Sequence, residues 1–365
     1  MNIHKHLLSC FTTVMISAAS GYSYAQENDS SASLSFSGYV EVYYNDNLYR
    51  QPNHTQPAFM YAYNKTHELA LNLGYIKASF QTGRVRANIA LAAGSYMNAN
   101  YAAEPGVLKN IYEADAGVKI SGKSNLWIDA GVMPSHIGFE SAAGKDCWTL
   151  TRSIAAESSP YFETGTRLSY TSRNNKWYLA VLLLNGWQRI EMTAGNNMPS
   201  FGHQVTFKPN DRLTLNSSSF IGSDKPDSAH QWRFFHDLYM QYQPGKAFGF
   251  IAGLDIGAAQ KMKESRSYNC WYAPVIIGKY AMSDRSSVAI RAEYYRDKNG
   301  AVIATALPDG FGVFGYSVNY DLKIGAHALW RIEARGFSGK DNLFINDGIP
   351  VKNDLFFTTS LAVSL

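Results

Sequence analysis

The sequence predicts an all-β protein, a transmembrane, antiparallel, up-and-down β-barrel of about sixteen strands. Three observations lead to this prediction. Apolar and polar side chains alternate along most of the chain in segments of roughly ten residues, as they do in strands with one lipid-facing side. The connections between these segments are alternately short and long. Residues 355–365 form an amphipathic strand, which a barrel requires if its last strand is to pair with its first.

The first 25 residues have the pattern of a secretory signal peptide. Lys5 gives a weakly basic start, residues 7–19 form the apolar stretch, and Ser23-Tyr24-Ala25 is a small-x-small cleavage site. We therefore expect residues 1–25 to be removed and residues 26–365 to form the barrel.

The composition fits a membrane barrel. Charged residues make up 17% of the chain, below the norm of about 25% for soluble proteins. The 24 tyrosines and 19 phenylalanines suit strands and interfacial aromatic girdles. The net charge of +4 is spread without a Lys/Arg cluster, which argues against a nucleic-acid partner. Beyond the signal, no apolar stretch reaches about 18 residues, so a membrane-embedded chain must be a closed barrel.

The clearest predicted strands, in the segments 84–91, 113–120, 288–294 and 328–335, carry charges on one face only. In a further segment, 69–75, the leucines and Tyr75 are expected to share one apolar face opposite Asn72. We predict that the charged faces line a water-filled lumen. The predicted pore-lining residues are Arg84, Arg86, Glu113, Asp115, Asp129, Arg167, Arg291, Glu293, Arg331 and Arg335.

The distribution of these charges leads to a hypothesis about selectivity. The arginines of this set other than Arg167 lie on strands flanking the seam between the first and last strands. Glu113, Asp115 and Asp129 lie on the strands that follow. Opposed basic and acidic walls would create a transverse field that selects polar solutes. The alternative is a generic hydrated wall.

The connections predict which end of the barrel faces which compartment. Seven are tight and rich in Gly, Pro, Asn and Asp, at 81–83, 122–123, 173–175, 208–211, 243–246, 283–285 and 322–327. The intervening ones are longer, at 45–65, 95–110, 134–160, 186–199, 222–230, 298–309 and 339–352, with 262–267 as an exception. This alternation is typical of short periplasmic turns and long extracellular loops, and it places both termini on the periplasmic side.

The loop 134–160 is the predicted constriction, because loops of this length are usually functional or disordered. Its apolar residues Ile137, Phe139 and Trp148 argue against disorder. We expect it to fold into the lumen and set the pore size, and the alternative is an ordinary surface cap. The charged residues assigned to the constriction are Glu140, Asp146, Arg152 and Glu157.

Two cysteines, Cys147 and Cys270, remain after the signal. Cys147 lies in the predicted constriction loop, and Cys270 begins a strand at the same end of the barrel. An exported protein passes through an oxidising compartment, so a disulfide that tethers loop to wall is possible. Two unrelated free thiols are the alternative.

No motif indicates catalysis, a cofactor or a metal. The G-x-G-x-x-G match at 310–315 runs into another alternating segment instead of a helix, so we read it as a glycine-rich strand. H-E-x-x-H and G-x-S-x-G are missing from the sequence. A triad assembled from distant strands remains open, so the alternatives are an outer-membrane enzyme of the phospholipase or protease kind, or a plugged structural or adhesive barrel.

Three stretches carry a family resemblance: 38–44 (GYVEVYY), 131–140 (GVMPSHIGFE) and 158–165 (SSPYFETG). With them, most of the mature chain resembles the OmpL-like outer-membrane β-barrel porins, common in Bacteroidetes-type bacteria. The resemblance implies a porin fold and passive diffusion, without catalytic residues. One departure is Leu365, since outer-membrane barrels more usually end in Phe or Tyr.

The function predicted from the sequence is that of a porin for small hydrophilic solutes in the outer membrane of a Gram-negative bacterium. The expected partners are outer-membrane lipid, the solutes, and the barrel-assembly machinery, which would contact the C-terminal strand. Assembly into a homo-oligomer is left open.

Overall fold

The computed structural model describes residues 32–50 and 52–365. The predicted signal peptide, residues 1–25, lies outside the described residues. Within the described part, no helix is long and apolar enough to span a bilayer.

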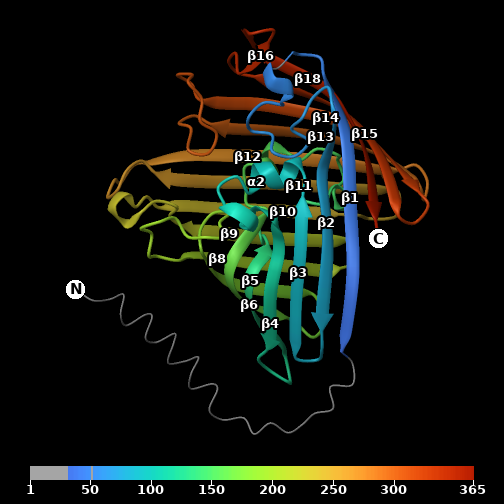
Figure 1. Cartoon of the computed structure of the whole chain (residues 1–365), viewed down its shortest axis with the longest axis vertical. Coiled ribbons are helices and arrows are strands. Elements are labelled where there is room, and N and C mark those ends of the chain that lie inside the picture. Colours follow the sequence, from blue (N-terminus) through green and yellow to red (C-terminus); the bar gives the residue numbers. More distant parts are fainter. Residues whose placement is uncertain (1–31, 51) are drawn as a thin grey trace. The chain divides into compact units, whose positions relative to one another are not determined.

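Sixteen antiparallel strands close into a barrel, as predicted (Figure 1). The last strand pairs with the first, with Tyr39 opposite Ser364 and Asn47 opposite Phe356, so the barrel has no open strand edge. The strands are β1 (Ser33–Asn47), β2 (Leu69–Gln81), β3 (Val85–Ala93), β4 (Ile111–Lys119), β5 (Asn125–Pro134), β6 (Phe162–Thr171), β7 (Trp177–Leu184), β8 (Ser200–Asn210), β9 (Leu213–Gly222), β10 (Arg233–Tyr242), β11 (Phe248–Gln260), β12 (Tyr268–Ala281), β13 (Ser286–Asp297), β14 (Phe311–Ile324), β15 (Ala328–Gly339) and β18 (Asn353–Ser364).

The predicted alternation of short and long connections is also confirmed. Short turns such as 82–84 and 325–327 join strands at one end, and the long connections lie at the other end. Some of the long connections carry small elements of their own. These are α2 (Ser95–Asn100), α3 (Ile154–Glu157), the hairpin of β16 (Phe344–Asn346) and β17 (Ile349–Val351), and the single 3-10 turns η1 (Pro52–His54), η2 (Gly106–Asn110), η3 (Gly144–Asp146) and η4 (Asp227–Ala229).

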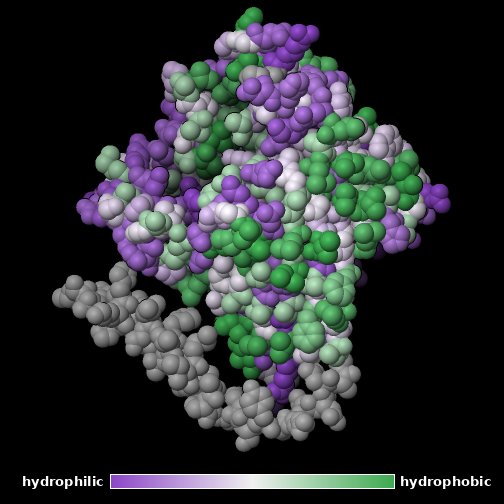
Figure 2. Space-filling view, viewed as in Figure 1, coloured by the Kyte–Doolittle hydropathy of each residue, from purple (hydrophilic) through white to green (hydrophobic). Residues whose placement is uncertain are grey.

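The two faces of the wall differ in polarity. On β1, Phe36, Val40 and Val42 point outward and are exposed, whereas Glu41 and Tyr43 point inward and are buried. Figure 2 shows apolar side chains gathered over the strands and many of the polar ones around the loops. This is the surface expected of a barrel whose outer face contacts lipid.

The strand pairing is irregular in places, and at one of them the strand faces differ from the expected ones. A bulge leaves Asn72 without a partner on β1, so Leu69 and Leu71 are exposed while Leu73 is buried. The prediction that these leucines share one face is therefore wrong, because one extra residue moves all later side chains to the other face. In β12, the pairs with β13 are interrupted around Pro274, whose nitrogen has no hydrogen to donate.

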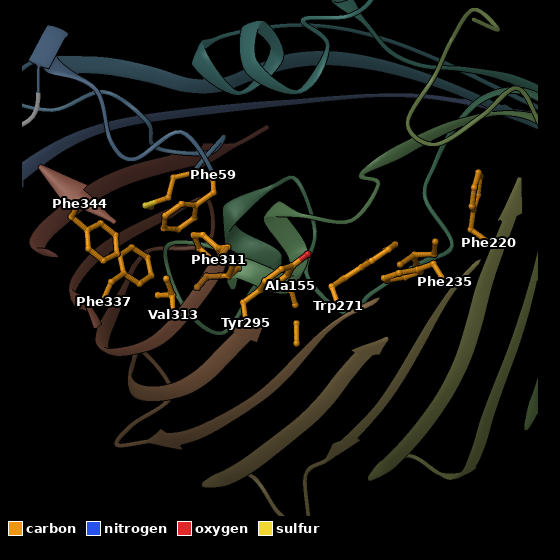
Figure 3. Close-up of a cluster of buried hydrophobic side chains, with 14 of the residues drawn as sticks. Phe59, Ala155, Phe220, Phe235, Trp271, Tyr295, Phe311, Val313, Phe337 and Phe344 are labelled. Atoms are coloured by element: carbon orange, nitrogen blue, oxygen red, sulfur yellow. The ribbon is translucent and has the colours of Figure 1, made fainter. Parts of the chain in front are cut away.

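Buried aromatic side chains fill part of the barrel interior (Figure 3). Phe59, from the connection 48–68, packs edge-on against Phe311 and Phe337, with ring centroids 5.0 and 5.3 Å apart. The connection between β1 and β2 therefore enters the barrel, an arrangement that the alternation pattern alone does not indicate. The glycine-rich segment 310–315 lies at the start of β14, as predicted, where a Cβ on Gly315 would come within 2.7 Å of the Glu293 carboxylate.

Candidate functional site

The connection between β5 and β6, residues 135–161, is hydrogen-bonded to inward-facing residues of the barrel wall, and we call it the inner loop. Arg331 of β15 donates from Nη1 to the Gly144 carbonyl at 2.6 Å and from Nη2 to the Cys147 carbonyl at 3.0 Å. Its Nε donates to Asp321 of β14 at 2.7 Å. Arg331 thus holds the inner loop while its charge is balanced by its neighbour on the wall.

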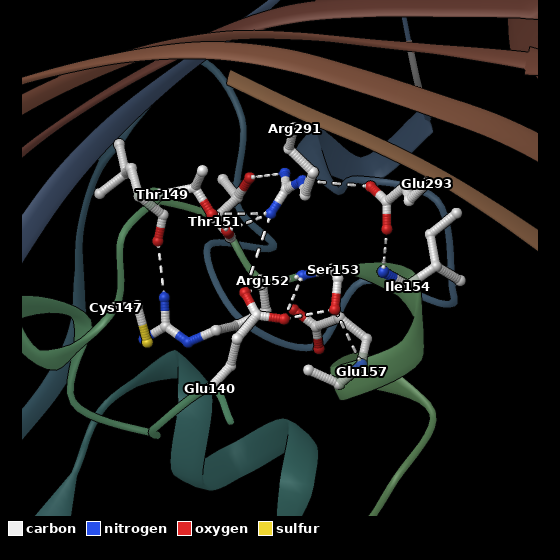
Figure 4. Close-up of polar contacts among 12 residues, drawn as sticks. Glu140, Cys147, Thr149, Thr151, Arg152, Ser153, Ile154, Glu157, Arg291 and Glu293 are labelled. Carbon is white, nitrogen blue, oxygen red and sulfur yellow. Dashed lines mark hydrogen bonds and ion pairs between the residues drawn. The ribbon is translucent and has the colours of Figure 1, made fainter. Parts of the chain in front are cut away.

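Two further arginines hold the next part of the inner loop, and Figure 4 shows the contacts of one of them, Arg291. Arg335 of β15 donates to the Arg152 carbonyl at 2.6 Å, and Arg291 of β13 donates to the Thr151 carbonyl at 2.7 Å. Glu333 of β15 accepts the Thr151 backbone N–H and hydroxyl, both at 2.6 Å, and lies 3.2 Å from Arg291. These wall charges are buried and mutually compensated, so loss of one partner is costly, about 3–5 kcal/mol.

Carboxylates continue this network into the short helix α3. Glu293 of β13 accepts the Ile154 backbone N–H at 2.6 Å, at the positive N-terminal end of the helix. Ser153 caps the same helix by accepting the Ala156 N–H at 3.1 Å, and it also donates its hydroxyl to Glu140. Burial raises the pKa of Glu140, and this is opposed by the positive charge of Arg291.

The inner loop is also tied to the connection 48–68. Glu157 of α3 accepts the backbone N–H groups of Tyr61 and Ala62 at 2.9 and 3.2 Å. Burial raises the pKa of Glu157 to about 7, against the opposing effects of these two hydrogen bonds and of Arg152. Arg152 itself donates to backbone carbonyls within the inner loop, including that of Leu150 at 2.6 Å. The two connections therefore form one hydrogen-bonded unit.

Apart from Arg84, the remaining predicted pore-lining charges lie on β3 to β6, and with Lys77 of β2 they form what we call the charged wall. Its members are Lys77, Arg86, Glu113, Asp115, Asp129 and Arg167. Arg86 makes a two-point contact with Asp129, at 2.6 Å for each nitrogen–oxygen pair, and Lys77 lies 2.6 Å from Glu113. The side chains of Lys77, Arg86 and Arg167 remain 25%, 30% and 22% exposed. The basic side chains on this side of the barrel are therefore partly exposed to solvent.

The structure corrects the hypothesis of opposed basic and acidic walls. Acids and bases of the charged wall alternate around this side of the barrel and pair across one intervening strand, β2 with β4 and β3 with β5. Arg84 is exposed in the turn between β2 and β3 and lies outside the strand to which it was assigned. Arg291, Glu293, Arg331 and Arg335 are on the inward face, but hydrogen bonds to the inner loop bury them, so they line the loop contact and are not exposed in an open lumen.

Of the two alternatives for the cysteines, the structure has the free thiols, so Cys147 and Cys270 form no disulfide with each other. Cys147 is buried in the inner loop, where its Sγ accepts the Ser141 N–H at 3.2 Å. Cys270 is exposed on β12, on the same outward face as Tyr268 and Tyr272. The barrel wall separates the two thiols. Among the constriction residues, Asp146 differs from the others, because its side chain is 52% exposed.

Sequence reasoning missed the pocket between the inner loop and β2 to β4. It has a volume of about 360 Å³ and is lined by Tyr75, Lys77, Tyr112, Glu113 and, from the inner loop, Phe139 and Asp146 among others. Lys77 could have been found only with the bulge at Asn72 known, because the bulge decides which β2 residues point inward. No group of three or more potential metal ligands occurs among the described residues.

Comparisons with known proteins agree with this geometry. The family model described as "Putative beta-barrel porin-2, OmpL-like" matches residues 33–365. No curated protein sequence matches the chain. Among solved structures, an anion-selective porin from Comamonas acidovorans is similar, with a TM-score of 0.61 and 10% identity, over 92% of this chain and 100% of that one.

Two other solved structures show the same fold. The outer-membrane channel DcaP of Acinetobacter baumannii has a TM-score of 0.59 at 12% identity, over 93% of this chain and 99% of that one. The trimer form of OmpT, an outer-membrane protein of Vibrio cholerae, has a TM-score of 0.58 at 10% identity, over 92% of this chain and all of that one. With the family match spanning the whole barrel, the chain belongs to the OmpL-like β-barrel porin family and is a porin of a Gram-negative outer membrane.

Proposed function

We propose that the chain forms a water-filled channel for passive diffusion of small hydrophilic solutes, with the inner loop as its constriction. The observation that carries this proposal is the unequal covering of the inward charges. The inner loop hydrogen-bonds to Arg291, Arg331 and Arg335 on one side, whereas Lys77 and Arg86 on the other side remain partly exposed. A solute passing the inner loop would therefore meet the charged wall, which biases entry without any chemical step.

The proposal includes no catalysis. Two His–Ser contacts occur on the strands, His203 with Ser219 at 2.5 Å and His236 with Ser217 at 3.1 Å. All four side chains point outward, on the faces that carry Phe201 and Phe234, so a solute in the lumen could not reach them. This arrangement supports passive transport over a protease-like site in the lumen. A phospholipase-like site would meet its lipid substrate on the outward face, so that alternative is tested by fatty-acid release.

Single-channel recording in planar lipid bilayers tests the proposal. Purified, folded protein is expected to give discrete conductance steps whose size scales with salt concentration. A folded barrel that inserts without any steps would contradict the proposal and favour a plugged structural or adhesive role. Release of fatty acids or cleavage of peptides by the same preparation would favour the enzyme.

We also propose that the chain assembles as a homo-oligomer through the outward face of β8 to β10. His203, Ser219 and His236 lie side by side in register across these strands, with Ser217 next to them, within an otherwise apolar band. Polar side chains that face lipid are costly, and contact with a second copy would shield them. Chemical cross-linking in outer membranes tests this: wild type should cross-link to itself, and His203→Leu with His236→Leu should reduce the cross-linked fraction.

The remaining proposed partners follow from the outer surface of the barrel. The exposed apolar residues of the strands, such as Phe36 and Ile290, would contact outer-membrane lipid. The barrel-assembly machinery would bind the outward face of β18, which includes Phe357 and Leu361. Replacing both residues by serine should slow assembly into membranes, which is measured by the appearance of the heat-modifiable folded form.

A further inference from the structure

The pocket of about 360 Å³ beside the inner loop has one wall made of barrel strands and one made of loop. Tyr75, Lys77, Tyr112 and Glu113 come from β2 and β4. Phe139, Asp146 and their neighbours come from the inner loop. Its volume is at the lower end of the roughly 300–1,000 Å³ of small-molecule sites, so it is large enough for one or two sugar-sized rings.

The strand wall of the pocket is aromatic. The rings of Tyr75 and Tyr112 are stacked, with centroids 5.2 Å apart and planes 12° from parallel. Tyr39 extends the row on the other side of Tyr75, with centroids 5.5 Å apart. Within residues 32–50 and 52–365, no hydrogen-bond partner occurs for the hydroxyls of Tyr75 and Tyr112. They are therefore free to donate to a solute or to accept from it.

The charges of the pocket restrict what can bind. Its one cationic side chain among the described lining residues, Lys77, is already paired with Glu113 at 2.6 Å. Asp146 adds a half-exposed carboxylate, which lies 3.5 Å from Lys145. An anion would find no unpaired positive charge, and an apolar solute would strip water from the Lys77–Glu113 pair at a cost. A neutral solute with many hydroxyls avoids both penalties.

We propose that this pocket is a binding site for neutral saccharides of one or two pyranose rings as they pass the constriction. The apolar C–H face of a pyranose ring would contact Tyr75, Tyr112 and Phe139. Its hydroxyls would bond to the two free tyrosine hydroxyls and to the carboxylates of Glu113 and Asp146. The inference rests on the proposed channel function and specifies its solute class.

Maltose is the probe, added during single-channel recording of the wild-type protein. It should cause transient interruptions of the current, and their frequency should rise with its concentration until the site saturates. Gluconate and lysine at equal concentrations, as an anionic and a cationic probe, should cause far fewer. A channel that never conducts would contradict the proposed function itself. Normal conductance that is insensitive to maltose would overturn only the saccharide site.

Variants of Tyr112 localise the site. Tyr112→Ala should raise the maltose dissociation constant at least tenfold, through loss of the aromatic contact and the hydroxyl. Tyr112→Phe removes the hydroxyl alone and should raise it about threefold to tenfold, the effect of one hydrogen bond. Tyr280→Ala, at an exposed tyrosine on the outward face of β12, should leave the maltose dissociation constant unchanged.

Heat-modifiable gel mobility verifies that each variant is folded, and Tyr112→Phe alone tests the site if the alanine variant does not fold. Unchanged maltose binding in a folded Tyr112 variant, or lysine blocking at lower concentration than maltose, would overturn the proposal.

Discussion

The two sides of the barrel interior use the same kinds of residue for different purposes. On β13 to β15, inward arginines and glutamates are buried and hydrogen-bonded to the inner loop. On β2 to β6, an inward lysine and inward arginines pair with buried acids and themselves stay partly exposed. An inward charge on a barrel strand is therefore a structural anchor or a lumen contact according to what covers it. We call the first group the anchored side and contrast it with the charged wall.

The largest effect should follow from breaking the anchored side. Glu333→Ala removes the acceptor of the Thr151 N–H and hydroxyl and leaves Arg291 without that partner. We expect a loss of stability of about 3–5 kcal/mol, together with a higher and noisier single-channel conductance as the inner loop loosens. The loss of stability is measured by the temperature at which the heat-modifiable folded form disappears, and the conductance is measured by bilayer recording. Glu264→Ala, in the exposed connection 261–267, is the matched control; equal behaviour of the two variants would refute the anchoring role.

Raising the pH should weaken the contact between the inner loop and the connection 48–68 without a mutation. The pKa of Glu157 is raised to about 7 by burial, so between about pH 4.5 and 7 the folded protein holds a proton that the unfolded chain has lost. Stability should therefore fall as the pH rises through this window, by on the order of 3 kcal/mol at most. Glu157→Gln, which stays neutral, should flatten the dependence of the melting temperature on pH from 5 to 8. An equally steep dependence in the variant would contradict this assignment.

A selectivity change should follow from disturbing the charged wall. Arg86→Gln removes the two-point partner of Asp129 and leaves a partly compensated carboxylate beside the lumen. We expect a shift toward cations, seen as a reversal-potential change of several millivolts in a salt gradient, with a smaller fall in melting temperature than in Glu333→Ala because Arg167 still lies 3.5 Å from Asp129. Arg84→Gln, in the exposed turn, is the control and should shift the potential less. Equal shifts from both variants would place selectivity at the mouth of the barrel.

The smallest effect should come from the cysteines. Cys270 is exposed on the outer face and Cys147 is buried in the inner loop. In detergent, a maleimide should label Cys270 within minutes and Cys147 only after denaturation, and Cys270→Ser should not alter conductance. Protein that stays unlabelled after denaturation and takes up two labels only after reduction would instead indicate a disulfide.

The strands could be predicted because a barrel wall imposes period-two alternation on nearly every segment. The turns could be predicted because their Gly, Pro and Asn residues suit tight reversals. The local sequence pattern does not show, however, which inward side chains are buried by another segment of the chain. Arg86 and Arg335 both stand on the polar face of an alternating segment. Only Arg335 is buried, because residues 135–161 pack against it in the folded chain. The bulge at Asn72 was equally hidden, because a single unpaired residue has no compositional signal.

Thiol accessibility in the lumen tests the contrast between the two sides most directly. In a background with Cys147→Ser and Cys270→Ser, one cysteine is introduced at Asn88 on the charged wall or at Ser317 on β14, which is buried on the anchored side. A cationic thiol reagent added during single-channel recording should stepwise reduce the current through the Asn88→Cys protein and leave the Ser317→Cys protein unaffected. Rapid block at position 317 with none at 88 would contradict the account.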